Sequence, residues 1–187
     1  MDVDVVTGAT VEVVTEVAWT PDQVWGLITA IHRIGDWSPE CVGARWLTDE
    51  VAPQVGSRFE GVNRFGGGSE STVICEITEA DEPRSFAWSV LDDRDDVERP
   101  GSRWRYDLSP ASTAHHTILR HQFVHGPGAT GVSVPAQQQP ARAVEIVTAR
   151  LEELGRNMER TLEAMTGATT FATVRRLGTS VNAAVAR

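Results

Sequence analysis

Three polar residues in stretches of alternating sequence are the side chains best placed to do chemistry. His121 lies in the stretch 117–123, on the same side as two apolar neighbours if this stretch is a strand. Asn63 and Tyr106 occupy equivalent positions in the stretches 58–65 and 103–108. An imidazole can transfer a proton near neutral pH, and an amide or phenol can polarise a ligand carbonyl. His121, Asn63 and Tyr106 are therefore the candidate catalytic residues.

The same three residues have a structural interpretation. A buried polar group without a partner costs roughly 1–3 kcal/mol, so each could instead be satisfied by the backbone or a water molecule in the core. The argument also depends on the strand register. A shift of one residue in the stretch 117–123 would turn Arg120 and Gln122 inward in place of His121.

The inward positions of these stretches are also rich in aromatic residues, and the chain has six Trp among 187 residues. Such side chains line ligand cavities, although they also fill ordinary cores. We expect ligand contacts from these aromatic and polar residues and from three residues of the last helix. The candidates are Trp37, Phe59, Asn63, Phe65, Phe86, Trp88, Trp104, Tyr106, His121, Phe123, Leu151, Leu154 and Met158.

Other kinds of chemistry have little support. A net charge of −9 argues against a nucleic-acid partner. Cys41 and Cys75 lack metal-ligand spacing, and the histidines at 115, 116, 121 and 125 have no accompanying ligand pattern, so we expect no metal and no cofactor. No apolar run approaches the ~18 residues that span a bilayer, and the N-terminus does not read as a leader. We expect a soluble, cytoplasmic protein without membrane insertion.

Two helical signals frame the strands that carry these residues. Apolar residues three and four apart predict an amphipathic helix over Pro140–Met165, with Gly167 placed to end it. Thr20 and Gln23 form a capping-box pattern that opens a short helix after the first strand. The strand candidates are 11–18, 42–48, 58–65, 71–79, 85–91, 103–108 and 117–123, and 126–140 is expected to be a linker.

The chain resembles the START-like helix-grip superfamily, also called SRPBCC or polyketide cyclase/dehydrase-like, from about Val11 to Met165. The motifs that carry the resemblance are 20–25 (TPDQVW), 34–40 (IGDWSPE), 56–64 (GSRFEGVNR), 82–88 (EPRSFAW) and 104–108 (WRYDL). The resemblance implies an α+β fold in residues 1–166. A curved seven-stranded antiparallel sheet would wrap around the C-terminal helix, with two short helices after the first strand and a cavity between sheet and helix. Many relatives have a Trp just after the glycine-rich hairpin, where this chain has Glu70 or Ser71.

Residues 167–187 extend beyond the usual end of that fold. Val174, Leu177, Val181 and Val185 have the spacing of a weak helix, so we expect a tail that forms a short helix or is disordered.

Members of the superfamily bind apolar molecules such as lipids, sterols and polyketides, and a minority catalyse cyclisation or dehydration. The first hypothesis is therefore a module that binds a small apolar molecule of lipid-, polyketide- or aromatic-like character. The second is a polyketide cyclase/dehydrase-type enzyme that uses His121, Asn63 and Tyr106. The third is a regulatory or interaction protein without turnover, with a possible homodimer formed through the tail. Fold alone does not decide among them.

Overall fold

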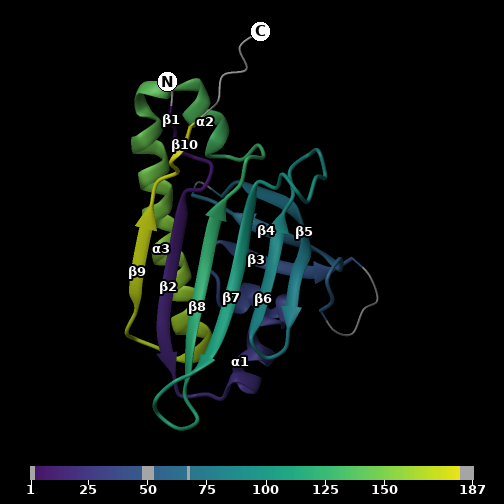
Figure 1. Cartoon of the computed structure of the whole chain (residues 1–187). Helices are drawn as coiled ribbons and strands as arrows, with labels where there is room; N and C mark the ends of the chain where they lie inside the picture. Colours follow the sequence, from purple (N-terminus) through teal and green to yellow (C-terminus); the bar gives the residue numbers. More distant parts are fainter. Residues whose placement is uncertain (1–2, 48–52, 67, 182–187) are drawn as a thin grey trace.

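The main body of the fold is a curved antiparallel sheet with one long helix against its concave face (Figure 1). The computed structural model describes residues 3–47, 53–66 and 68–181. In spatial order the main sheet contains β3 (Cys41–Trp46), β4 (Arg58–Arg64), β5 (Glu70–Asp81), β6 (Ser85–Val90), β7 (Ser102–Pro110), β8 (Thr117–His125), β2 (Thr10–Val17) and β9 (Ala172–Arg176). The predicted α+β helix-grip architecture is confirmed.

The sheet has eight strands rather than the predicted seven, because part of the tail joins it. The weak helical spacing of the tail was misleading: β9 pairs antiparallel with β2, and Val174 lies opposite Glu12. The physical reason is the edge of β2, whose backbone groups need partners once the other edge is paired with β8. A further two-stranded pairing joins β1 (Val3–Asp4) to β10 (Ser180–Val181). Val185 lies outside the described residues.

The two short helices after the first long strand are present. The predicted capping box opens α1 (Pro21–Ile28): the Thr20 hydroxyl accepts from the Gln23 backbone N–H at 3.4 Å, and the Gln23 side chain accepts from the Thr20 N–H at 2.9 Å. A 3₁₀ helix, η1 (Ile31–Asp36), follows. A Cβ at Gly35 would clash with the Val42 carbonyl, so glycine allows η1 to pack against the start of β3. This packing sets the course of the η1–β3 loop.

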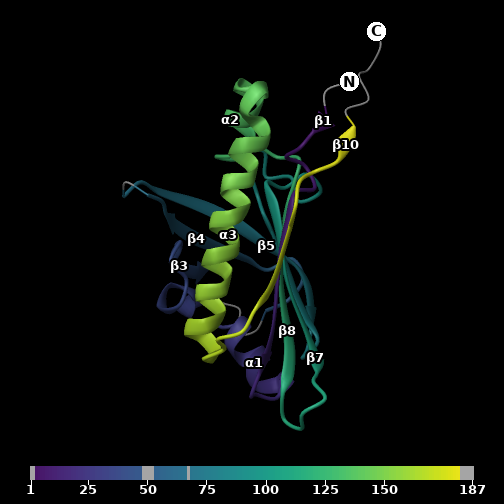
Figure 2. The same cartoon turned by 90° about the vertical axis from the view of Figure 1, so that its left-hand side faces the viewer.

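The long helix α3 (Ala143–Thr166) lies against the concave face, and β3 and β4 curve round towards it (Figure 2). Its apolar stripe is buried as predicted, except that Val144 in the first turn is 53% exposed. The helix ends at Gly167, whose φ of 76° is left-handed. No helix among the described residues is both long and apolar enough to cross a membrane.

The segment expected to be a linker contains helical structure. α2 (Ser133–Gln138) lies within it, and the 3₁₀ turn η2 (Pro140–Arg142) begins at its last residue, where the long helix was predicted to start. The Thr130 hydroxyl accepts hydrogen bonds from the backbone N–H groups of Val132 at 3.2 Å and Ser133 at 3.0 Å, which satisfies donors at the start of α2. These hydrogen bonds to a residue just before the helix support a helical turn in a segment whose Gly, Pro and Gln content predicted an irregular linker.

Candidate functional site

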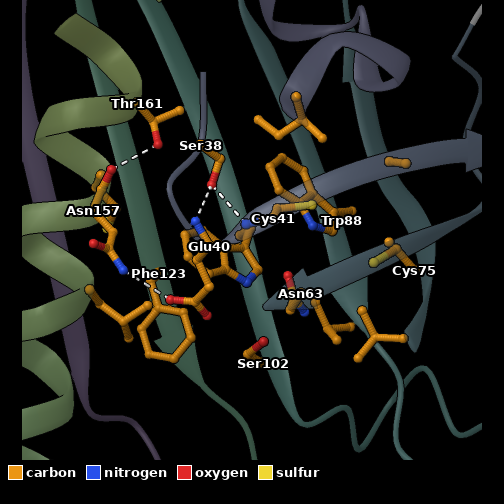
Figure 3. Close-up of a pocket in the computed structure, with 18 of the residues that line it drawn as sticks. Ser38, Glu40, Cys41, Asn63, Cys75, Trp88, Ser102, Phe123, Asn157 and Thr161 are labelled. Carbon is orange, nitrogen blue, oxygen red and sulfur yellow. Dashed lines mark hydrogen bonds between the residues drawn. The ribbon is translucent and has the colours of Figure 1, made fainter. Parts of the chain in front are cut away.

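A cavity of about 610 Å³ lies between the concave face of the sheet, α3 and the η1–β3 loop (Figure 3). All the residues predicted to contact ligand line it except Leu151. Leu151 is only 4% exposed and belongs to the core. Its backbone carbonyl accepts a hydrogen bond from the Arg175 Nε of β9 at 3.2 Å. Leu154 and Met158, one and two turns further along, do line the cavity. The helix therefore divides its apolar stripe between core and cavity.

The sheet side of the cavity is an aromatic wall built by cross-strand pairs. Trp88 on β6 lies opposite Trp104 on β7, and their rings stack with centroids 6.2 Å apart and an interplanar angle of 4°. Trp104 lies in turn opposite Phe123 on β8, with an edge contact at 5.0 Å. Phe59 meets Trp88 edge-on at 6.2 Å. Alternation along each strand thus places these rings on one face.

His121 and Tyr106 form a stacked pair within this wall. They lie opposite each other on β8 and β7, with ring centroids 4.1 Å apart and planes inclined by 19°. The inward register of His121 is confirmed, because Arg120 is exposed and its guanidinium lies 3.3 Å from the Glu12 carboxylate. Neither ring nitrogen of His121 hydrogen-bonds to any residue that the structure describes. The pair therefore places an imidazole with two buried, unpartnered nitrogens in the cavity lining.

Burial alters the proton chemistry expected of this pair. Desolvation lowers the pKa of His121 to about 3, so the imidazole is neutral at physiological pH and is a weak base. Desolvation also raises the pKa of Tyr106, which keeps its phenol protonated. The expectation that His121 transfers protons near neutral pH does not fit this environment. Both groups are suited instead to neutral hydrogen bonding.

Asn63 lines the same cavity but does not join the pair. It lies on β4, opposite Cys41 of β3, and β5 and β6 separate it from the strand that carries Tyr106. With neighbouring strands ~4.8 Å apart, three steps along the sheet amount to roughly 14 Å. The three candidate catalytic residues therefore share a cavity without forming one constellation, and only a ligand of some length could touch all of them.

The opposite wall carries a charged network that the sequence reasoning missed. The Arg150 guanidinium of α3 binds Glu40 of the η1–β3 loop through two nitrogens, one of them 3.0 Å from Glu40 Oε2. It also donates to Glu153 at 2.7 Å, and the Asn157 side-chain amide donates to Glu40 at 3.0 Å. Figure 3 shows Asn157 and Glu40 pointing towards each other. The Ser38 hydroxyl fixes the loop by accepting from the Glu40 and Cys41 N–H groups at 3.2 and 2.9 Å.

One signal could have revealed part of this network. Arg150 and Asn157 are seven residues apart and flank Leu154 on the cavity side of the predicted helix, so helical spacing alone places them on one face. No local pattern links Glu40 to that face, because the pairing spans 110 positions.

Comparisons with known proteins agree with this architecture. The family model described as polyketide cyclase / dehydrase and lipid transport matches residues 8–163. No curated protein matches the chain. Among solved structures, the polyketide-cyclase-like protein Cgl2372 from Corynebacterium glutamicum is 27% identical with a TM-score of 0.59, over 84% of this chain and 88% of that one.

Two further structures share the fold at lower identity. XoxI from Bacillus cereus is 15% identical with a TM-score of 0.55, over 85% of this chain and 94% of that one. The di-domain ARO/CYC StfQ from the steffimycin biosynthetic pathway is 12% identical with a TM-score of 0.62, over 85% of this chain and 50% of that one. The family match covers most of the chain, from the first long strand to the last turn of α3, and this protein therefore belongs to the polyketide cyclase/dehydrase and lipid transport family.

Proposed function

We propose that this protein binds a small apolar molecule of aromatic or polycyclic character between the sheet and α3. The observation that carries the proposal is the pair of unsatisfied nitrogens on His121, which is 4% exposed and faces an aromatic-lined cavity. A neutral imidazole has one hydrogen-bond donor and one acceptor. Leaving such a group without a hydrogen bond in a buried site costs roughly 1–3 kcal/mol. A ligand hydroxyl or carbonyl group on His121 would recover that free energy.

The size and lining of the cavity support the same proposal. Its volume of about 610 Å³ lies within the range of ~300–1,000 Å³ typical of sites for small molecules. The stacked Trp88 and Trp104 rings offer flat surfaces to a planar ligand. Cys41 and Cys75 are free thiols, in keeping with action in a reducing cytoplasm.

A cyclase or dehydrase activity is the second candidate, favoured by the adjacency of Tyr106 and His121 within a family that includes such enzymes. With a pKa of about 3, His121 would assist by hydrogen bonding to a carbonyl rather than by abstracting a proton. Dehydration of a β-hydroxyketone that is lost in Tyr106→Phe would support this activity.

A tryptophan at position 71 tests the binding site directly. Ser71 lines the cavity on β5, whereas its neighbour Thr72 is exposed and faces outward, so Thr72→Trp is a matched control. Titration with the neutral fluorophore N-phenyl-1-naphthylamine should show binding to the wild type and to Thr72→Trp. In Ser71→Trp the added ring occupies the cavity, and affinity should fall by about tenfold or more.

Equal affinity in all three proteins, with unchanged thermal midpoints, would contradict the proposal. Native mass spectrometry of the purified wild type provides an independent measurement. A bound small molecule that is absent from Ser71→Trp is the expected result.

A further inference from the structure

The described residues of the cavity wall carry more negative than positive charge. Among the described residues that line the cavity, the Asp, Glu, Lys and Arg side chains are Glu40, Arg150 and Glu153 only. Both lining histidines, His121 and His125, have a pKa lowered by burial. The lining therefore carries one positive and two negative charges.

The single positive charge is already neutralised by protein groups. Arg150 donates to Glu40 through both terminal nitrogens and to Glu153 through one of them, and its side chain is 20% exposed. Glu40 is 16% exposed and also accepts from Asn157. An incoming anion would have to displace a carboxylate from this pair, which would leave that carboxylate partly buried without its partner.

The network is also held in place from both sides. Arg150 and Asn157 lie two turns apart on α3. Ser38 anchors the backbone at Glu40 in the facing loop (Figure 3). The Arg150 guanidinium additionally lies over the Phe65 ring, 5.9 Å from its centroid. These contacts keep the guanidinium from turning freely towards a ligand.

We propose that this carboxylate-bound arginine makes the cavity selective for uncharged ligands, an inference that rests on the proposed binding function. The ligand class is a neutral aromatic or polycyclic molecule bearing hydroxyl or carbonyl groups. Free fatty acids, sulfonates and phosphate esters are disfavoured, because their charge would lie near Glu40 and Glu153 in a site that is partly shielded from water.

Two probes with nearly the same ring system test this selectivity. N-phenyl-1-naphthylamine is neutral, and 8-anilinonaphthalene-1-sulfonate adds a single negative charge to that skeleton. The wild type should bind the neutral probe at least about tenfold more tightly. Glu40→Gln should free Arg150 and raise the affinity for the sulfonate by about tenfold, which reduces or reverses the preference.

Two further variants make the result specific to the cavity. Glu153→Gln removes one negative charge while leaving the Arg150–Glu40 pair, so it should shift the preference in the same direction by about threefold. Glu145→Gln removes the same charge from an exposed position on α3, where Glu145 pairs with Arg142, and should leave the preference unchanged.

The outcomes separate this inference from the proposed function. Equal binding of both probes to the wild type, or an unchanged preference in both Glu40→Gln and Glu153→Gln, would overturn the selectivity while leaving the binding function intact. If the wild type binds neither probe, both proposals fail. Should Glu40→Gln not fold, the Glu153→Gln measurement decides the question.

Discussion

Two histidines on the same face of β8 are buried to the same extent but differ in their hydrogen bonding. His121 is 4% and His125 is 5% exposed, and both side chains reach the cavity lining. His125 Nδ1 lies 2.9 Å from the Gly126 carbonyl and Nε2 lies 2.9 Å from the Thr130 hydroxyl. The carbonyl can only accept, so Nδ1 carries the proton and Nε2 accepts from Thr130. His121 has neither kind of partner among the described residues.

The difference shows that two equally buried histidines can differ completely in hydrogen bonding. His125 helps to hold the loop that leads into α2. Its partner Thr130 also accepts hydrogen bonds from the backbone N–H groups at the start of that helix. His121 contributes stacking to Tyr106, but neither of its ring nitrogens has a hydrogen-bond partner among the described residues. Both nitrogens of His125 are thus used within the fold, whereas the hydrogen-bonding capacity of His121 is unused by the described residues.

The largest effect should come from replacing His125 by leucine, with His121→Leu as the comparison. His125→Leu leaves the Gly126 carbonyl and the Thr130 hydroxyl without their partner, so the free energy of unfolding should fall by about 3 kcal/mol. His121→Leu removes an unsatisfied polar group and should change the free energy of unfolding by less than about 1 kcal/mol in either direction. Urea denaturation measures both. Equal losses in the two variants would remove the distinction between them.

The next effect is the pH dependence of stability. The pKa of His121 is about 3 in the folded protein, below its unfolded value near 6.5, so the unfolded state binds more protons as the pH falls. Stability is therefore lost as the pH drops below about 6.5, by roughly 2 kcal/mol between pH 6.5 and 5. Burial lowers the pKa of His125 in the same direction, so some slope should remain in His121→Leu. Urea denaturation at several pH values measures this dependence. If the free energy of unfolding of His121→Leu depended on pH as steeply as that of the wild type, His121 would not be the titrating group.

The smallest effect concerns ligand affinity. His121→Phe keeps a ring against Tyr106 but removes both nitrogens. Affinity for 2-naphthol should fall by about fivefold, since one buried hydrogen bond contributes about 1 kcal/mol, while affinity for naphthalene should not change. Isothermal titration calorimetry provides the comparison, with the hydrocarbon as its internal control. A parallel loss for both ligands would mean that His121 acts through shape alone.

Much of this protein followed from local patterns. The Thr20 capping box, the alternation that turns His121 inward and the apolar stripe of α3 are all present where the sequence predicted them. Each depends on contacts within a few residues or on the periodicity of one helix or strand, and both can be recognised directly in the sequence.

Long-range pairing decided the rest. The tail residues around Val174 have a helical spacing, but they became a strand because β2 offered an unpaired edge. Asn63 shares the alternation of Tyr106, yet strand order puts β5 and β6 between the strands that carry them. Neither outcome can be derived from local periodicity, because which strands pair depends on contacts between segments that are far apart in the sequence.

By itself the sequence determined strands β2 to β8, the helices α1 and α3, the inward face of each of these strands and the residues that furnish an aromatic cavity. Only the tertiary structure decided which polar groups in that cavity are satisfied. Among the described residues it left both ring nitrogens of His121 without a partner, and it brought Glu40 to Arg150 across 110 positions. Hydrogen bonds and ion pairs act over a few ångströms, so their partners are set by how distant segments pack rather than by the order of residues along the chain.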